Sequence, residues 1–211
     1  LASLGVGPGQ DKEDNPFMGL RGIRLLLRYP EILKTQIKAI LKASPSGNVR
    51  IMIPMLSTIE ELRAVSRMMQ EARQEMADAN MVFSDRMELG IMVEIPAAAL
   101  MLDAFLGDID FVSIGTNDLI QYLLAVDRVN QNVAYIYDAY HPAVLRMIHL
   151  TVQTAHKKGK PVSVCGEMAS DPAATALLVG LGVDCLSVSA RMFLKIKHTV
   201  RSLYFEKCAE L

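Results

Sequence analysis

The sequence carries almost no excess of charge of either sign. It holds 22 lysine and arginine residues against 23 aspartate and glutamate residues, which leaves a net charge of −1 at pH 7. A protein that binds DNA or a membrane surface through its charge would carry a marked basic excess. The composition therefore argues against a nucleic-acid or membrane partner.

Long apolar runs are absent as well. The longest stretch without a charged residue spans 172–183, far short of the roughly 18 apolar residues that a membrane helix needs. No basic segment followed by an apolar one opens the chain, so a secretory signal is not indicated. Apolar residues still make up 51% of the chain, which is enough for a core and excludes disorder. We predict a soluble protein.

Cysteine is scarce. The chain has an odd number of cysteines, and none of them shows Cys-x-x-Cys spacing. They are Cys165, Cys185 and Cys208. Neither a disulfide framework nor a zinc site is indicated, and a reducing, cytoplasmic location is predicted. Residues 1–14 hold three glycines and no hydrophobic period. Because the chain also begins with leucine, we expect a fragment of a longer polypeptide, with an irregular remnant at 1–14 and one domain at 15–211.

Short apolar runs followed by helical patterns dominate the rest of the chain. A helix is expected to begin near Phe17, to be interrupted at Pro30 and to continue to the turn at 44–47. Ser57 and Thr58 each have a glutamate three residues on, which indicates capping boxes at the start of a long helix. Five apolar runs are predicted to be strands, each followed by a helix: 50–55, 89–93, 111–114, 162–164 and 186–188.

These continuous apolar runs predict a parallel sheet that helices cover on both faces. Two α/β architectures fit: an open doubly wound sheet, or part of a (β/α)₈ barrel. No G-x-G-x-x-G follows any strand, which weakens the dinucleotide-binding form of the first.

Polar side chains follow successive strands at their carboxyl ends, the edge where parallel α/β proteins assemble active sites. An ionised Glu94 beside a core is costly unless a positive group compensates it. Glu94 and Asp118 come from consecutive strands, and their oxygens suit Mg²⁺ better than zinc. The alternative is that Glu94 pairs with an arginine and Asp118 caps a helix.

Cys165 ends a predicted strand and is followed by Gly166 and Glu167, although a single cysteine is often a small buried apolar residue. Arginines could supply the cationic part of a site. Arg21 and Arg24 are expected on one face of the first helix, and Arg128 follows the helix predicted from about Asp118. Guanidinium groups would suit a small anion that carries phosphate and carboxylate.

Five motifs stand out along the chain: NPFMGLRGIR at 15–24, MVEIPA at 92–97, SIGTNDLIQY at 113–122, AVDR at 125–128 and VCGEMA at 164–169. In matching order they resemble the phosphoenolpyruvate-binding domain of enzyme I, the phosphoenolpyruvate-protein phosphotransferase family of the bacterial sugar phosphotransferase system. The resemblance runs from about residue 15 to 203. The stretches 140–145 and 159–168 are similar to the nitrogen-related branch of the family.

The resemblance implies a (β/α)₈ TIM-barrel fold, truncated here to about the last five βα units. It also implies binding of phosphoenolpyruvate with Mg²⁺, transfer of the phosphoryl group to a histidine on another domain, and release of pyruvate. Earlier strands of the family carry further arginines in a Gly-Leu-x-Arg-Thr-Glu stretch that this chain lacks. Residues 9–12 match a second family stretch only loosely, so the chain by itself is expected to be inactive.

The resemblance assigns a role to each candidate residue. Glu94 and Asp118 would bind the metal. Phosphate would be held by Arg21, Arg128 and Asn117. Cys165 would protonate the enolate carbon, supported by Glu167.

Further expectations concern partners and alternatives. A phosphocarrier protein of the HPr kind would act through a domain outside this chain, in sugar transport or nitrogen regulation, and the barrel would pair as a homodimer. The equivalent domain of a pyruvate phosphate dikinase or phosphoenolpyruvate synthase is an alternative. So is a non-catalytic module for phosphoenolpyruvate sensing or dimerisation.

Overall fold

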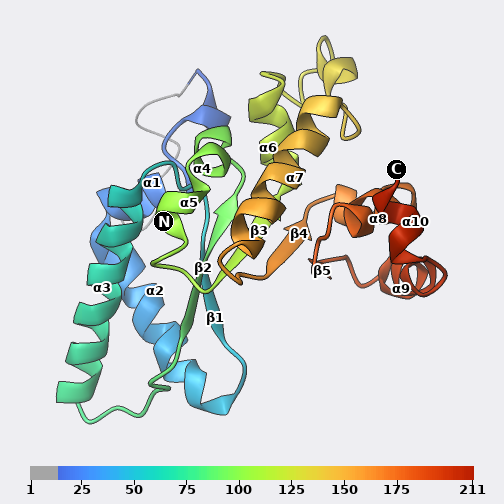
Figure 1. Ribbon diagram of the computed structural model, residues 1–211. Helices are drawn as coiled ribbons and strands as arrows, with labels where there is room; N and C mark the ends of the chain where they lie inside the picture. The colour runs from blue at the N-terminus through green and yellow to red at the C-terminus, as the bar shows by residue number, and fades with distance from the viewer. Residues whose placement is uncertain (1–13) are drawn as a thin grey trace.

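A computed structural model describes residues 14–211 (Figure 1). Its centre is a five-stranded parallel sheet in the order β1-β2-β3-β4-β5. The strands are β1 (Arg50–Ile53), β2 (Glu88–Val93), β3 (Phe111–Gly115), β4 (Val162–Cys165) and β5 (Cys185–Leu186).

The strand order decides between the two predicted architectures. Each strand pairs with its neighbour in sequence, as in a (β/α)₈ barrel, whereas a doubly wound sheet reverses its order at a switch point. The described residues do not close the sheet, because β1 and β5 are its two edges. The predicted α/β fold of barrel type is confirmed, with β5 at 185–186 rather than 186–188.

Ten α-helices and several 3₁₀ turns connect and flank the strands within residues 14–211. No helix in that range is long and apolar enough to cross a membrane. The α-helices are α1 (Gly22–Arg28), α2 (Pro30–Ala43), α3 (Ile59–Asp78), α4 (Pro96–Leu100), α5 (Leu102–Phe105), α6 (Thr116–Leu123), α7 (Pro142–His156), α8 (Pro172–Gly180), α9 (Phe193–Arg201) and α10 (Phe205–Ala209).

Helix α3 begins with the predicted capping box. The Thr58 hydroxyl accepts from the Glu61 amide, and the Glu61 carboxylate accepts from the Thr58 amide. The second predicted box does not form, because the Ser57 amide and hydroxyl both donate to Glu61 instead. One glutamate therefore satisfies both residues before the helix.

The first helix begins later than predicted. Residues 16–18 form a 3₁₀ turn (η2, Pro16–Met18), and α1 starts only at Gly22. Gly22 has φ +55°, and a Cβ there would lie 2.7 Å from Cγ of Met55, so the chain turns sharply at this glycine. Arg21 consequently precedes the helix, and the Arg24 guanidinium donates to the Met18 carbonyl. The two arginines do not share one helix face.

The two faces of the sheet differ, which corrects the prediction of two covered faces. One face carries branched aliphatic side chains that are buried in the core with the helices, such as Ile53, Ile91 and Val164. On the other face Met52 is 38% exposed, and Ser163 and Cys165 are half-buried. Apolar and small residues on this second face made the strands resemble two-sided core strands.

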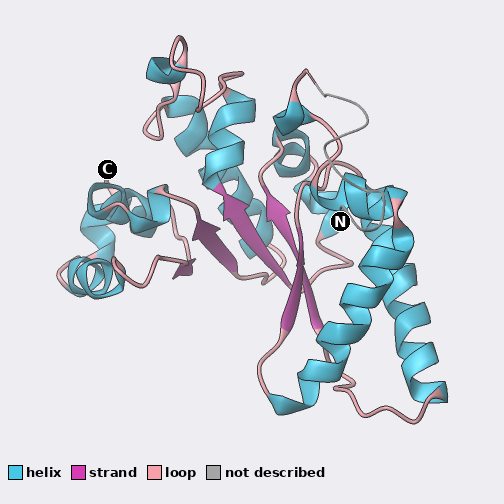
Figure 2. Ribbon diagram, turned by 180° about the vertical axis from the view of Figure 1, so that it is seen from behind, coloured by secondary structure: helices cyan, strands magenta, loops and turns pink. Residues whose placement is uncertain are grey.

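The helices are distributed along the sheet in sequence order. Figure 1 shows α2 and α3 beside the β1 side, and α8, α9 and α10 gathered as a lobe beyond β5. The view from behind shows the strands as one twisted layer (Figure 2). Gly180 of α8 lies directly against the Cys208 backbone of α10, where a Cβ would come within 2.0 Å of the carbonyl oxygen.

Candidate active site at the carboxyl edge of the sheet

Asp118 lies between two arginines from distant parts of the chain. Its carboxylate accepts from Nη2 of Arg21 at 2.9 Å and from Nη1 of Arg128 at 3.0 Å. Asp118 is only 7% exposed, so both ion pairs are partly shielded from water. Helix α6 has no side-chain cap, and the alternative that Asp118 caps this helix is therefore wrong.

Two aromatic residues complete the arginine cluster. The guanidinium carbons of Arg21 and Arg128 lie 5.7 and 5.6 Å from the ring centroid of Phe17, a cation–π distance. The Tyr122 hydroxyl accepts from Nη1 of Arg21 at 3.3 Å and donates to the Phe17 carbonyl. Burial, with the charge of Asp118, raises the pKa of Tyr122, which keeps this hydroxyl a donor.

Glu94 is buried directly after β2, with 5% of its surface exposed. Its Oε1 accepts from the Met55 amide at 2.7 Å, and no arginine or lysine within residues 14–211 forms an ion pair with it. The predicted alternative of an arginine partner is therefore not found. Burial, countered by the Met55 hydrogen bond and reinforced by Asp118, raises the pKa of Glu94 to about 6.

Gly115 gives the Glu94 carboxylate room. A Cβ on Gly115 would lie 2.9 Å from the Met92 sulfur and 3.0 Å from Oε2 of Glu94. Only glycine therefore allows the Glu94 side chain to cross the end of β3.

Cys165 ends β4 on the same face of the sheet. Its sulfur lies 3.8 Å from the Ser113 hydroxyl and 3.5 Å from the Ile114 carbonyl oxygen. Burial raises the pKa of the Cys165 thiol; the Ser113 hydrogen bond opposes that rise and the charge of Glu94 adds to it. The thiol is thus kept protonated at neutral pH.

The turn after Cys165 packs against the start of α6. The Thr116 hydroxyl donates to the Cys165 carbonyl at 2.7 Å, and Oδ1 of Asn117 accepts from the Glu167 amide at 3.0 Å. Gly166, between Cys165 and Glu167 in the chain, has φ +96°, and a Cβ there would come within 2.4 Å of the Thr116 hydroxyl. Glu167 is joined to the site through its backbone, while its side chain is exposed.

An open pocket of about 520 Å³ lies on this side of the site. It is lined by Asn117, Cys165, Gly166, Glu167, Ser170, Ser187, Val188 and Ser189. The first three residues of α6 join the two halves of the site: Thr116 and Asn117 hold the Cys165 turn, and Asp118 holds the arginines.

Only two carboxylates, those of Glu94 and Asp118, are predicted to bind a metal ion. Within residues 14–211 no three histidine, cysteine, aspartate or glutamate side chains gather closely enough to hold a metal ion. Glu94 is nevertheless a buried carboxylate that forms no ion pair with a lysine or arginine in the described part of the chain. That donor chemistry fits a hard divalent ion which takes further oxygen ligands from substrate and water.

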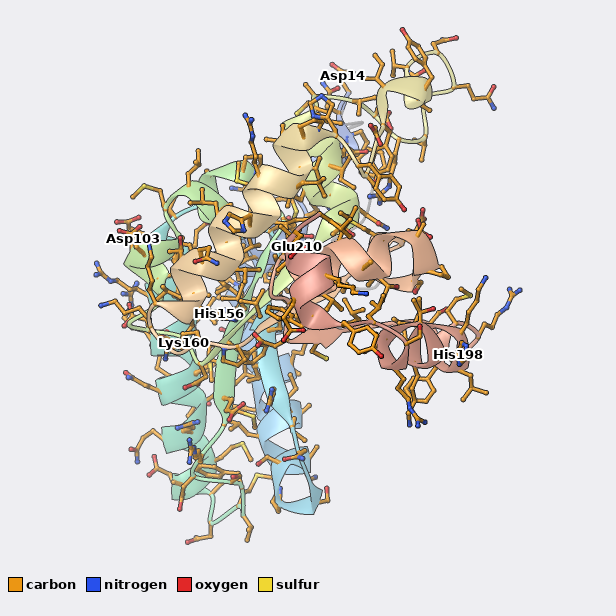
Figure 3. All side chains as sticks on the ribbon, turned by 45° about the vertical axis from the view of Figure 1, so that its right-hand side comes forward. Asp14, Asp103, His156, Lys160, His198 and Glu210 are labelled. Atoms are coloured by element: carbon orange, nitrogen blue, oxygen red, sulfur yellow. The ribbon has the colours of Figure 1, made fainter. Side chains whose placement is uncertain are left out.

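Sequence reasoning missed five residues that shape the site: Phe17, Ser113, Thr116, Gln121 and Tyr122. All belong to the motifs at 15–24 and 113–122, but their types and spacing are equally typical of packing. Among the histidines, His156 donates through Nε2 to the Asp184 carboxylate at 2.8 Å. It lies near Lys160 at the far end of α7, whereas His198 projects from α9 (Figure 3).

Comparison with known proteins identifies close sequence relatives. A phosphoenolpyruvate-protein phosphotransferase of Priestia megaterium is 46% identical over 192 residues, which cover 91% of this chain and 34% of the relative. Those of Bacillus subtilis (strain 168) and Staphylococcus epidermidis are both 47% identical, over 91% and 95% of this chain. The chain spans about a third of the length of these relatives.

A solved structure shares the fold at low sequence identity. A citrate lyase from Burkholderia xenovorans LB400 superimposes with a TM-score of 0.58 at 16% identity, over 79% of this chain and 53% of that one. The likeness concerns the fold alone.

The family model described as "PEP-utilising enzyme, PEP-binding domain" matches residues 5–205. With 46–47% identity to its relatives and a match over nearly its whole length, the chain belongs to the PEP-binding domain family of PEP-utilising enzymes.

Proposed function

We propose that this chain is the phosphoenolpyruvate-binding catalytic part of a phosphoenolpyruvate-protein phosphotransferase. The phosphoryl group would pass to a histidine outside the chain, and pyruvate would be released. One observation carries the proposal: two arginines, two buried carboxylates and a protonated thiol meet at one edge of the sheet, in a chain that is 46% identical to a relative of that name.

Arg21 and Arg128 are proposed to bind the phosphate, with Asn117 beside them. A phosphate monoester carries about −1.5 to −2 charges at neutral pH, and guanidinium groups bind such oxygens bidentately. Both arginines now donate to Asp118. Substrate binding would therefore transfer their hydrogen bonds from a carboxylate to the phosphate.

Glu94 and Asp118 are proposed to hold Mg²⁺, which would supply charge stabilisation for the transferring phosphoryl group and the enolate. When the two arginines donate to the phosphate instead of to Asp118, the Asp118 carboxylate would be free to bind a cation. Because the pKa of Glu94 is raised to about 6, a cation would bind the ionised form and displace a proton only below about that pH.

Cys165 is proposed to donate the proton that converts the enolate into pyruvate. The proton passes from sulfur to the methylene carbon, and the enolate oxygen becomes the ketone oxygen. A thiol kept protonated at neutral pH can serve as this acid. Glu167 supports the thiol through the Asn117 contact to its backbone.

Titration calorimetry with phosphoenolpyruvate, with and without Mg²⁺, tests the proposal. We expect binding that weakens at least about tenfold when Mg²⁺ is removed, because the metal offsets the charge of two carboxylates near the substrate. Arg128→Ala should abolish measurable binding, whereas Arg146→Ala, on the exposed surface of α7, should not. Equal affinity with and without metal would contradict the assigned carboxylates.

Several finer expectations stay proposals. We infer one domain at 15–211, a cytoplasmic location, a homodimer, and a phosphocarrier protein of the HPr kind acting through a further domain. Residues 1–13 lie outside the described structure. The named relatives favour a protein phosphotransferase over a dikinase, a synthase or a non-catalytic module. Their names do not test the likeness to the nitrogen-related branch, which stays a prediction from the motifs.

A further inference from the structure

Gln121 makes two hydrogen bonds to the turn that leads from α6 to Arg128, one through its backbone and one through its side chain. The Gln121 carbonyl accepts from the Val126 amide at 3.0 Å, and its side-chain Oε1 accepts from the Arg128 amide at 3.1 Å. Ala125, directly before Val126, has φ +52°. One residue thus binds the turn at two points.

The turn needs such an anchor. A left-handed backbone is unfavourable for a residue with a Cβ, so Ala125 persists in it only where surrounding contacts impose the conformation. Glycine would adopt the same φ without that cost. The two hydrogen bonds to Gln121 are contacts of this kind.

Gln121 does not serve stability alone. It is 4% exposed, and its side-chain nitrogen is buried without a hydrogen-bond partner among the described residues. A buried donor without an acceptor destabilises a fold, so the nitrogen of this side chain adds nothing to stability. The contribution of the side chain lies in its oxygen, which accepts from the Arg128 amide.

The anchored turn determines where the Arg128 guanidinium lies. From the fixed Arg128 amide the side chain reaches Oδ1 of Asp118 and the ring of Phe17. We propose that Gln121 is a positioning residue that holds Arg128 in the geometry that binds the substrate phosphate. The proposal rests on the proposed function of Arg128, and buried Gln121 itself does not contact the substrate.

Replacement of Gln121 tests this role in the full chain. Gln121→Met fills the same volume but removes the acceptor, and we expect phosphoenolpyruvate to bind roughly tenfold more weakly with Mg²⁺ present, since one hydrogen bond at a charged site is lost. The melting temperature should change little, because removal of the unpaired Gln121 nitrogen offsets the loss of an acceptor for the Arg128 amide. Gln70→Met, exposed on α3, is the matched control.

A second substitution separates positioning from general damage. Ala125→Gly removes the left-handed strain, so the double variant Gln121→Met with Ala125→Gly should recover part of the lost affinity. Amide exchange measured by NMR should show faster exchange at Arg128 in Gln121→Met. Gln121→Asn cannot reach the Arg128 amide; it should weaken binding equally and serves if the methionine variant does not fold.

The outcomes distinguish a failure of the positioning role of Gln121 from a failure of the proposed function. If the unaltered chain binds phosphoenolpyruvate and Gln121→Met binds it equally well, Gln121 has no positioning role and the proposed function stands. Lost affinity with unchanged exchange at the Arg128 amide would also overturn the inference. If the unaltered chain binds no phosphoenolpyruvate, the proposed function falls and the inference falls with it.

Discussion

Glu94 combines burial, a single backbone hydrogen bond and a raised pKa of about 6. Because its pKa is higher in the folded chain than the ordinary 4.5, the folded state binds its proton more readily. Between about pH 4.5 and 6 stability therefore rises as pH falls, and above pH 6 the ionised carboxylate costs stability. A cation site has such a cost when no cation is bound.

Glu94→Gln should therefore stabilise the chain at pH 8 in the presence of a chelator. The amide keeps an acceptor for Met55 and removes the charge, so the gain should reach up to about 2 kcal/mol, the equivalent of a pKa rise from 4.5 to about 6. The difference should vanish below pH 4.5. Urea unfolding at several pH values measures it, with Glu210→Gln at the exposed end of α10 as control. A destabilised variant at pH 8 would disprove the unfavourable carboxylate.

At the scale of elements, the first turn of α6 connects the sheet edge with the thiol. Thr116 is completely buried, and its hydroxyl donates to the carbonyl of Cys165, the last residue of β4. Gly166 then packs on the same hydroxyl. The end of β4 is consequently fixed by a side chain of the preceding βα unit.

Thr116→Val should loosen this strand end. The isosteric change leaves the Cys165 carbonyl unpaired, which we expect to cost about 1–3 kcal/mol and to speed alkylation of Cys165 by iodoacetamide, measured by peptide mass spectrometry. Thr151→Val is the matched control, because Thr151 is also completely buried and donates to Met147 within α7. It should lower stability without changing the alkylation of Cys165. Equal effects on Cys165 in both variants would argue against the specific link.

The helices and strands also show which features of the fold and of the site can be predicted from the sequence. Apolar runs and caps predicted all five strands and most helices, because buried strands and helix starts leave local patterns. The motifs placed Glu94, Asp118 and Cys165 at one edge through the register of parallel strands. The pairing of Asp118 with Arg21, 97 residues away, leaves no local pattern. The role of Gln121 likewise depends on a turn conformation at Ala125 that no spacing encodes.

The whole molecule presents a sheet with one covered face and one partly open face. Strand β1 is an edge of that sheet among the described residues, and Met52 on it is 38% exposed. Edge strands with exposed apolar side chains are prone to pair with another chain. The aliphatic face of the sheet cannot contact another chain, because its side chains are buried against the helices.

The chain should therefore self-associate as its concentration rises, and Met52→Lys should reduce this association. A charge on the open face of an edge strand disfavours contact with a second sheet edge. Sedimentation velocity over a range of concentrations measures the effect. Met81→Lys is a closely matched control, because Met81 is also 38% exposed but lies in the loop after α3, where a lysine should leave association unchanged. A monomer at every concentration, or equal loss of association in both variants, would show that the edge at β1 does not drive contact between copies.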